Sequence, residues 1–191
     1  MLLLMIMTET LQLHTSRSII TVLQPSDAAL LRDFVRRNRQ HLAAWEGERD
    51  ENYYTFASCE QRLHAMQSSF QQGIVLPLAF FSPNKEEMLG TVALSNIVRG
   101  FFQACYLGYS LDGAQQGRGL MFEVLQEVIR YAFDEMALHR LMANYVPQNQ
   151  RSAKLLERLG FTQEGYAKDY LKIAGRWQDH VLTALTNPRP M

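Results

Sequence analysis

Hydrophobic positions in the N-terminal third of the chain change from a strand pattern to a helical one. Residues 11–23 hold a short apolar run and predict an edge strand or a hairpin. Ser26 and Asp27 supply a cap for a helix that reaches about Asn38, and a second helical stretch covers residues 53–71. We therefore expect two helices after the first β element.

The middle of the chain has β-type patterning interrupted by turn residues. Apolar runs predict three strands, at residues 74–81, 88–98 and 102–111, and Gly100 breaks the chain between the last two. Antiparallel strands are the ones that short turns can join. We expect these three strands to form an antiparallel meander.

Helix and strand alternate in the C-terminal part of the chain. Apolar side chains at helical spacing form one stripe, made of Met121, Leu125, Val128, Ile129, Ala132 and Met136. The elements expected after it are a strand at 140–146, a helix at 149–159 ended by Gly160, and a hairpin of residues 161–171 and 177–185. This order predicts one α+β domain, residues 1–191, built on a mixed sheet.

Composition and charge restrict the class of protein. The 191 residues are 47% hydrophobic, enough for one sizeable core. Nineteen basic and nineteen acidic residues give a formal net charge of +0, which argues against a dedicated nucleic-acid binder, so no DNA partner is expected. Cys59 and Cys105 cannot form a disulfide framework, and this cysteine usage suits a reducing compartment. We expect a cytoplasmic protein.

The N-terminal run of apolar residues is too short for a signal peptide or a membrane span. Residues 1–7 lack a basic leader and pass directly into Thr8. A membrane-spanning helix needs roughly 20 apolar residues. We expect residues 1–10 to form a flexible tail, translation to start at Met5 or Met7, and no membrane association.

A glycine-rich turn between a predicted strand and a predicted helix is the first candidate site. Gly117 and Gly119 let the backbone approach a ligand closely, and the free N–H groups of the following helix favour an anion. A diphosphate suits such a place, and Arg118 adds a positive charge. The P-loop motif is absent, and the third glycine of the dinucleotide-binding motif is absent too. Taken alone, the turn is equally compatible with ordinary turn chemistry.

Two motifs at a fixed distance carry a resemblance to a known superfamily. Gln116-x-x-Gly119-x-Met121 resembles the [QR]-x-x-G-x-[GA] acetyl-CoA loop of GNAT acetyltransferases, with Met121 in place of a small residue. Residues 149–161 resemble the N-x-x-S segment that closes the same cofactor site, about thirty residues further on. The resemblance implies a GNAT fold, which has a mixed, mostly antiparallel central sheet, helices on both faces, and strands splayed where the cofactor binds.

Within that superfamily the chain resembles the RimJ/RimL ribosomal-protein N-terminal acetyltransferases, especially the RimJ type. The segments that carry this resemblance are His41-Leu42 with Trp45, residues 106–110, 116–123, 139–145, 164–170 and 175–181. It implies acetyl-CoA as co-substrate and no metal. It also implies that the acceptor is the N-terminal alanine amine of a small-subunit ribosomal protein, with the assembling small subunit as a further possible partner.

The resemblance assigns cofactor contacts residue by residue. The implied set is Tyr109, Ser110, Leu111, Gln116, Gly117, Arg118, Gly119, Leu120, Met121, Asn149 and Ser152. In the resembled family the backbone of residues 109–111 pairs with the pantetheine arm, and its N–H groups polarise the reacting carbonyl.

Catalytic roles carry over only in part. Ser152 matches the proposed acid for the departing thiolate. The glutamate base of the RimL-like pattern is replaced here by Tyr106, which is therefore the second catalytic candidate. Tyr106 could accept a proton only through water or in a perturbed state, and the role that we favour for it is to shape the acceptor pocket. The acceptor contacts that we expect are Trp45, Glu46, Tyr53, Tyr106 and Tyr170. The acidic residues beside Trp45 could attract a cationic peptide terminus, but the sequence alone favours a solvated loop.

Several alternatives stay open at this point. The acceptor could be a small amine such as a polyamine or an aminoglycoside, or the chain could be a weakly catalytic acetyl-CoA-binding assembly factor. The arginines on one face of the first helix fit an acidic partner or plain surface. Cys105 fits an ordinary core position better than a covalent route, and the histidines have no metal-ligand spacing.

Overall fold

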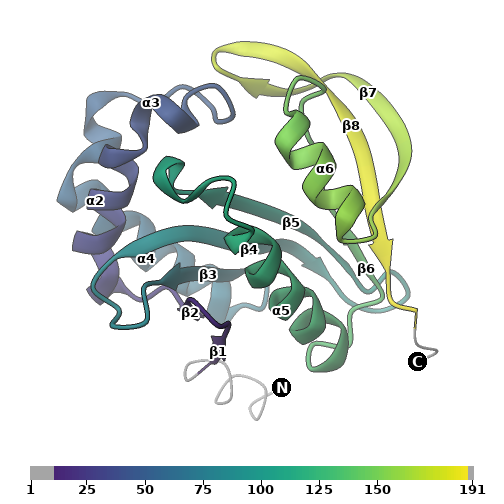
Figure 1. Ribbon diagram of the computed structural model, residues 1–191, viewed down its shortest axis with the longest axis horizontal. Helices are drawn as coiled ribbons and strands as arrows, with labels where there is room; N and C mark the ends of the chain where they lie inside the picture. The colour runs from purple at the N-terminus through teal and green to yellow at the C-terminus, as the bar shows by residue number, and fades with distance from the viewer. Residues whose placement is uncertain (1–10, 189–191) are drawn as a thin grey trace.

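The computed structural model describes residues 11–188, and its framework is one mostly antiparallel sheet. The strands, in chain order, are β1 (Gln12–His14), β2 (Ile19–Val22), β3 (Leu76–Phe81), β4 (Met88–Val98), β5 (Ala104–Leu111), β6 (Arg140–Met142), β7 (Thr162–Ile173) and β8 (Arg176–Thr186). In space their order is β1-β2-β3-β4-β5-β6-β8-β7 (Figure 1). The expected N-terminal hairpin, the antiparallel meander and the C-terminal hairpin are all present.

Helical segments connect these strands. They are η1 (Pro25–Asp27), α2 (Ala28–Arg37), α3 (Arg39–Leu42), η2 (Glu51–Tyr54), α4 (Phe56–Gln71), η3 (Gly113–Gln115), α5 (Leu120–Asp134) and α6 (Gln150–Arg158). Within residues 11–188, no helix combines the length and the apolar character that crossing a bilayer requires. The flexible tail expected at residues 1–10 lies outside the described residues.

The two faces of the sheet are covered by different helices. On β3, Leu78 and Phe80 belong to the core cluster that includes α5, whereas Ala79 and Phe81 belong to the cluster that includes α2 and α4. Successive side chains of a strand point to opposite faces, so this fully buried strand serves both cores. Each large apolar side chain buried in this way contributes about 1.5–3 kcal/mol. Figure 1 shows α5 in front of the sheet and α4 behind it.

The sheet separates where the cofactor was expected. β5 and β6 are paired in parallel from Ala104 opposite Arg140 to Tyr106 opposite Met142. Beyond that point β6 ends, while β5 continues to Leu111 along β4. The edge of β5 that faces away from β4 therefore runs free of β6 over residues 107–111. This confirms the mixed sheet, with helices on both faces and a splay between two strands.

Some boundaries differ from the sequence prediction for local reasons. The second helix starts at Phe56 and not at Tyr53, because the Thr55 side chain accepts the Ser58 N–H at 3.2 Å and caps it there. Asp27 was predicted to cap the helix that follows it, but its side chain makes no cap hydrogen bond to α2. Its carboxylate accepts the Gln24 N–H, three residues earlier, at 2.9 Å.

The strand predicted at 140–146 ends at Met142. In its continuation the Asn144 side chain accepts the Thr183 N–H at 3.3 Å, and an isolated bridge joins Tyr145 to Val181. A side-chain oxygen therefore replaces the main-chain partner that a regular ladder would supply.

Candidate active site

The turn after β5 has the backbone geometry that the glycine motif predicted. Gly117 and Gly119 have φ values of 74° and 76°, a left-handed conformation that side chains disfavour. α5 starts directly after Gly119, and no side chain caps its first turn. The first N–H groups of α5 are therefore available to an anionic ligand at the positive end of the helix dipole.

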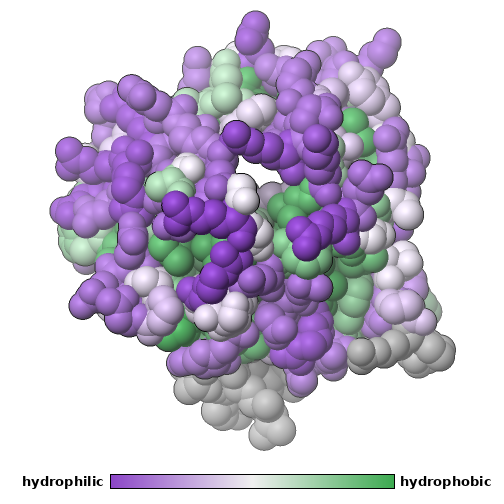
Figure 2. Space-filling model, viewed as in Figure 1, coloured by the Kyte–Doolittle hydropathy of each residue, from purple (hydrophilic) through white to green (hydrophobic). Residues whose placement is uncertain are grey.

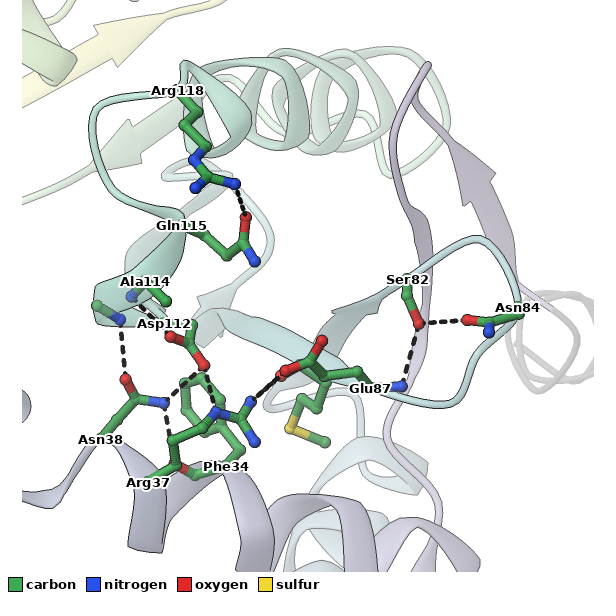
Figure 3. A network of polar contacts seen from close by, with 12 residues as sticks. Phe34, Arg37, Asn38, Ser82, Asn84, Glu87, Asp112, Ala114, Gln115 and Arg118 are labelled. Carbon is green, nitrogen blue, oxygen red and sulfur yellow. Dashed lines mark hydrogen bonds and ion pairs between the residues drawn. The ribbon is translucent and has the colours of Figure 1, made fainter.

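A buried polar network ties this turn to α2 (Figure 3). The Asp112 carboxylate accepts hydrogen bonds from Arg37 at 2.6 Å, from Asn38 at 3.2 Å and from the Ala114 N–H at 2.8 Å. Asn38 in turn accepts the Gly113 N–H at 2.8 Å. Burial alone would raise the pKa of Asp112, but these donors outweigh it and hold the pKa below the usual value. The network fixes the glycine turn relative to the helix behind it.

A cleft of about 720 Å³ opens between the glycine turn and α6. Its walls include Tyr109, Ser110, Leu111, Gln116, Gly117, Gly119, Leu120, Met121, Asn149, Ser152 and, at the far end, His41, Leu42, Trp45 and Glu46. Figure 2 shows an opening between α3 and α6 in the same view, with hydrophilic side chains on its rim. We call this space the cofactor cleft.

Two hydroxyl groups meet inside the cofactor cleft. The Tyr109 phenol, from the free edge of β5, lies 2.5 Å from Oγ of Ser152 in the first turn of α6. Burial raises the pKa of Tyr109 to about 12, although the hydrogen bond with Ser152 acts in the opposite direction. Tyr109 is therefore protonated at neutral pH and can donate to Ser152. Asn149 caps α6, because its side chain accepts the Ser152 N–H at 3.1 Å and so holds Ser152 in place.

A side-chain bridge crosses the cleft at Gln116. Arg151 of α6 donates to Oε1 of Gln116, and Nε2 of Gln116 lies 2.9 Å from Nε2 of His41. Because an amide nitrogen can only donate, Nε2 of His41 must be the accepting nitrogen. The bridge connects α6, the glycine turn and α3.

A second cleft, of about 860 Å³, adjoins the first on the side of α3. It is lined by Val35, Arg39, Leu42, Ala43, Glu46, Gly47, Glu48, Arg49, Asp50, Tyr53, Tyr54 and Ala174. Leu42 and Glu46 line both clefts and so form their junction. The loop that carries them is fixed to the β7–β8 turn, since the Ala174 N–H donates to the Glu46 carbonyl at 2.8 Å.

The structure brings together most of the residues predicted for the cofactor, with one exception. Arg118 is not among the residues that line the cofactor cleft, and its guanidinium donates at 3.5 Å to Gln115 instead (Figure 3). The backbone is the reason, because Arg118 lies between two glycines of positive φ in the turn.

The residues predicted for the acceptor are divided among three places. Trp45 and Glu46 line the cofactor cleft, and Tyr53 lines the second cleft. Tyr106 and Tyr170 line neither the cofactor cleft nor the second cleft. Their side chains are hydrogen-bonded to each other, and this bond raises the pKa of Tyr106. Tyr170 also accepts the Asn144 amide at 3.3 Å.

Sequence reasoning missed one wall of the cleft. Arg151, Lys154 and Arg158 lie on one face of α6 and line the cofactor cleft, opposite the glycine turn. Their spacing of three and four residues places them on one helix face, a signal present in the sequence. Cys105 is fully buried in the core and burial raises its pKa to about 12, which agrees with a structural thiol.

Comparison with known proteins identifies the class. The model of the acetyltransferase (GNAT) domain family matches residues 17–162, and the chain belongs to this family. The ribosomal protein uS5-alanine N-acetyltransferase of Escherichia coli is 47% identical over 177 residues, which are 93% of this chain and 91% of that one. The resemblance to the RimJ type is thereby confirmed.

Two solved structures agree with this assignment. The ribosomal-protein-S5-alanine acetyltransferase from Vibrio fischeri superposes with a TM-score of 0.89 at 37% identity, covering 94% of this chain and all of that one (100%). RimJ of Mycobacterium smegmatis, solved in complex with CoA disulfide, gives a TM-score of 0.84 at 26% identity and covers 88% of this chain and 81% of that one. The GNAT fold predicted from the sequence is confirmed.

Proposed function

We propose that the chain transfers the acetyl group of acetyl-CoA to the α-amine of the N-terminal alanine of a small-subunit ribosomal protein, uS5. The observation that carries this proposal is the 47% identity, over nearly the whole chain, to an enzyme named for that reaction. The cofactor cleft supports it, because it combines an anion-binding helix start, a free strand edge and a hydroxyl pair.

The residues of the cleft fit the proposed co-substrate. At Gly117 an added Cβ would meet no atom within 4 Å, and at Gly119 only the end of Arg17 at 3.8 Å, so the space above the turn is open. The diphosphate would take the N–H groups of the first turn of α5, and Arg151, Lys154 and Arg158 add positive charge on the facing wall. The free edge of β5 at residues 109–111 offers main-chain groups to an amide-containing arm. When bound, acetyl-CoA supplies a reactive thioester carbonyl.

The hydroxyl groups of Ser152 and Tyr109 would supply the proton that the departing sulfur takes up. A thiolate leaving group has an ordinary pKa of about 8.5, so acid catalysis is useful but modest. Ser152 lies in the cleft with the protonated Tyr109 phenol behind it at 2.5 Å. Ser152 would give its proton to the departing sulfur and regain one from Tyr109. The resemblance implied Ser152 as the acid, and its contact with Tyr109 supports a role for Tyr109 as its partner.

The test compares three acceptors at equal concentration with acetyl-CoA. They are a peptide with a free N-terminal alanine, the same peptide blocked at its N-terminus but containing lysine, and spermidine. We expect the free alanine peptide to be acetylated at a kcat/KM at least 100-fold above the other two. A preference for the blocked peptide or for spermidine would contradict the proposed acceptor. Binding of acetyl-CoA without turnover of any acceptor would indicate a binding protein and contradict the enzyme.

A further inference from the structure

The carboxylate at the junction of the two clefts, which the sequence predicted only as an acceptor contact, has no part in the proton transfers described so far. Among the described residues that line the cofactor cleft, Glu46 is the acidic one, and it also lines the second cleft. We propose that Glu46 binds the α-ammonium group of the acceptor and takes its proton before the amine attacks. This inference rests on the proposed function and names the group that acts in place of the missing strand glutamate.

The position of Glu46 is fixed by contacts far away in the sequence. Its carbonyl accepts the Ala174 N–H at 2.8 Å, which attaches the loop to the β7–β8 turn. The neighbouring Trp45 also lines the cofactor cleft, so residues 45 and 46 together form part of its wall. An acceptor that reaches the thioester from the second cleft passes this junction with its terminal ammonium first.

The charges around Glu46 leave its carboxylate available. Burial raises the pKa of Glu46, and Arg49 and Arg62 partly offset this rise. Arg49 is 4.0 Å from the carboxylate, and its guanidinium stacks on the Tyr53 ring at 4.5 Å. Arg62 donates to the Tyr53 carbonyl at 3.1 Å and to Cys59 at 3.0 Å.

Other charged or titratable groups face the same junction. Those in the second cleft are Arg39, Glu48, Asp50, Tyr53 and Tyr54, and His41 lies in the cofactor cleft. Arg39 is paired with Glu51 at 2.5 Å, and Glu48 packs against Gly175, with its Oε1 2.4 Å from where a Cβ would be. Glu46 is therefore the carboxylate that lines the cofactor cleft, and its ion pair with Arg49 is long, at 4.0 Å.

The protons balance as follows. The acceptor ammonium gives one proton to Glu46, which releases it to solvent after the product leaves. The neutral amine forms a bond to the carbonyl carbon as the carbon–sulfur bond breaks. The amine then loses a second proton to become an amide, and the sulfur gains one from the Ser152–Tyr109 pair, which the second amine proton restores. The net reaction releases one proton. An α-ammonium has an ordinary pKa of about 7.7–8.0, so a carboxylate of raised pKa is a suitable acceptor.

The experiment is a pH profile of kcat/KM for the free alanine peptide with wild type, Glu46→Gln and Glu46→Asp. At neutral pH we expect kcat/KM of Glu46→Gln to be about 100-fold below that of wild type, a usual size for a general-base contribution. The kcat/KM of Glu46→Asp should lie between the two. The loss should shrink to a few-fold above about pH 9, where the amine is already neutral. Affinity for CoA, measured by titration calorimetry, should stay within twofold, which also shows that the variants fold.

A matched control is Glu127→Gln. Glu127 forms an ion pair with Arg130, three residues further on, at 3.1 Å, and it lines neither of the two clefts. This variant should keep wild-type activity at every pH. A Glu46→Gln enzyme within threefold of wild type at pH 7, or a loss constant from pH 6 to 10, would overturn the role of Glu46. If wild type itself prefers lysine or spermidine, the proposed acceptor fails, and the same variants assayed with that amine test Glu46 separately.

Discussion

The two ends of the active-site region are built in different ways. The cofactor end, residues 109–121 with 148–158, presents main-chain groups: an uncapped helix start and a free strand edge. The acceptor end, residues 42–54 with 170–180, presents side chains that come from separate segments joined by contacts such as Ala174 to Glu46. Main-chain recognition depends on a few glycines and a cap, so it tolerates change elsewhere. Recognition by side chains depends on each residue, so specificity should reside at the acceptor end.

The largest effect should follow from filling the cofactor end. Gly119→Trp places a side chain where the diphosphate would bind, and we expect CoA affinity to fall at least 100-fold, about 2.7 kcal/mol, by titration calorimetry. Gly100→Trp is the control, because Gly100 has a φ of 73°, open space around it and a position in the β4–β5 turn. The Gly100→Trp variant introduces the same backbone strain of about 1–2 kcal/mol and should bind CoA with wild-type affinity. Equal affinity of both variants would show that the anion site is elsewhere.

The next effect concerns the network that attaches the glycine turn to α2. Asp112→Asn removes the charge from a carboxylate that is 3% exposed and bonded to Arg37. We expect the free energy of unfolding to fall by about 2 kcal/mol, and the thermal midpoint by roughly 6 °C, measured by calorimetry at pH 7. Asp33→Asn, which breaks an exposed pair with Arg32 at 2.6 Å, should cost under about 1 kcal/mol.

The same variant gives a pH dependence. The folded pKa of Asp112 lies below its ordinary value, so its stabilisation is complete above about pH 4 and is lost as the pH falls through the folded pKa. The difference in stability between wild type and Asp112→Asn should therefore narrow below pH 4. A difference that stays constant down to pH 2 would contradict an ionised Asp112 in the native state.

The smallest effect should come from the hydroxyl pair between the two ends. Ser152→Ala should lower kcat about tenfold, roughly 1.4 kcal/mol, because a thiolate needs little help to leave. Tyr109→Phe should lower it by less, and the double variant should equal Ser152→Ala, since the two act in one chain of hydrogen bonds. Stopped-flow single turnovers measure this step. Additive losses would show that Tyr109 and Ser152 act independently.

The sequence predicted the backbone features of the cofactor end well because their signals are local. Gly119, the cap at Asn149 and the stop at Gly160, whose φ is 89°, each act within one turn of chain. The apolar runs of β3 and β4, bounded by turn residues, were sufficient to predict the meander. The sequence did not predict that Arg118 would be absent from the lining of the cleft, because a side-chain direction depends on backbone angles that residue type does not determine.

The sequence did not predict the long-range contacts, which join segments far apart in the chain. Gln116 and His41, like Arg37 and Asp112, are separated by 75 residues, and no spacing rule connects them. Tyr109 and Ser152 were named separately, but their contact over 43 residues was not foreseen. The shortened β6 has the same cause, since its end depends on Asn144 and the distant Thr183.

The most direct test of the account is the position of the acetyl group on one acceptor that offers both kinds of amine. A peptide with a free N-terminal alanine and an internal lysine, incubated with the protein and acetyl-CoA, is fragmented by tandem mass spectrometry. The account predicts one acetyl group, on the alanine α-amine. Acetylation mainly on the lysine side chain would contradict it.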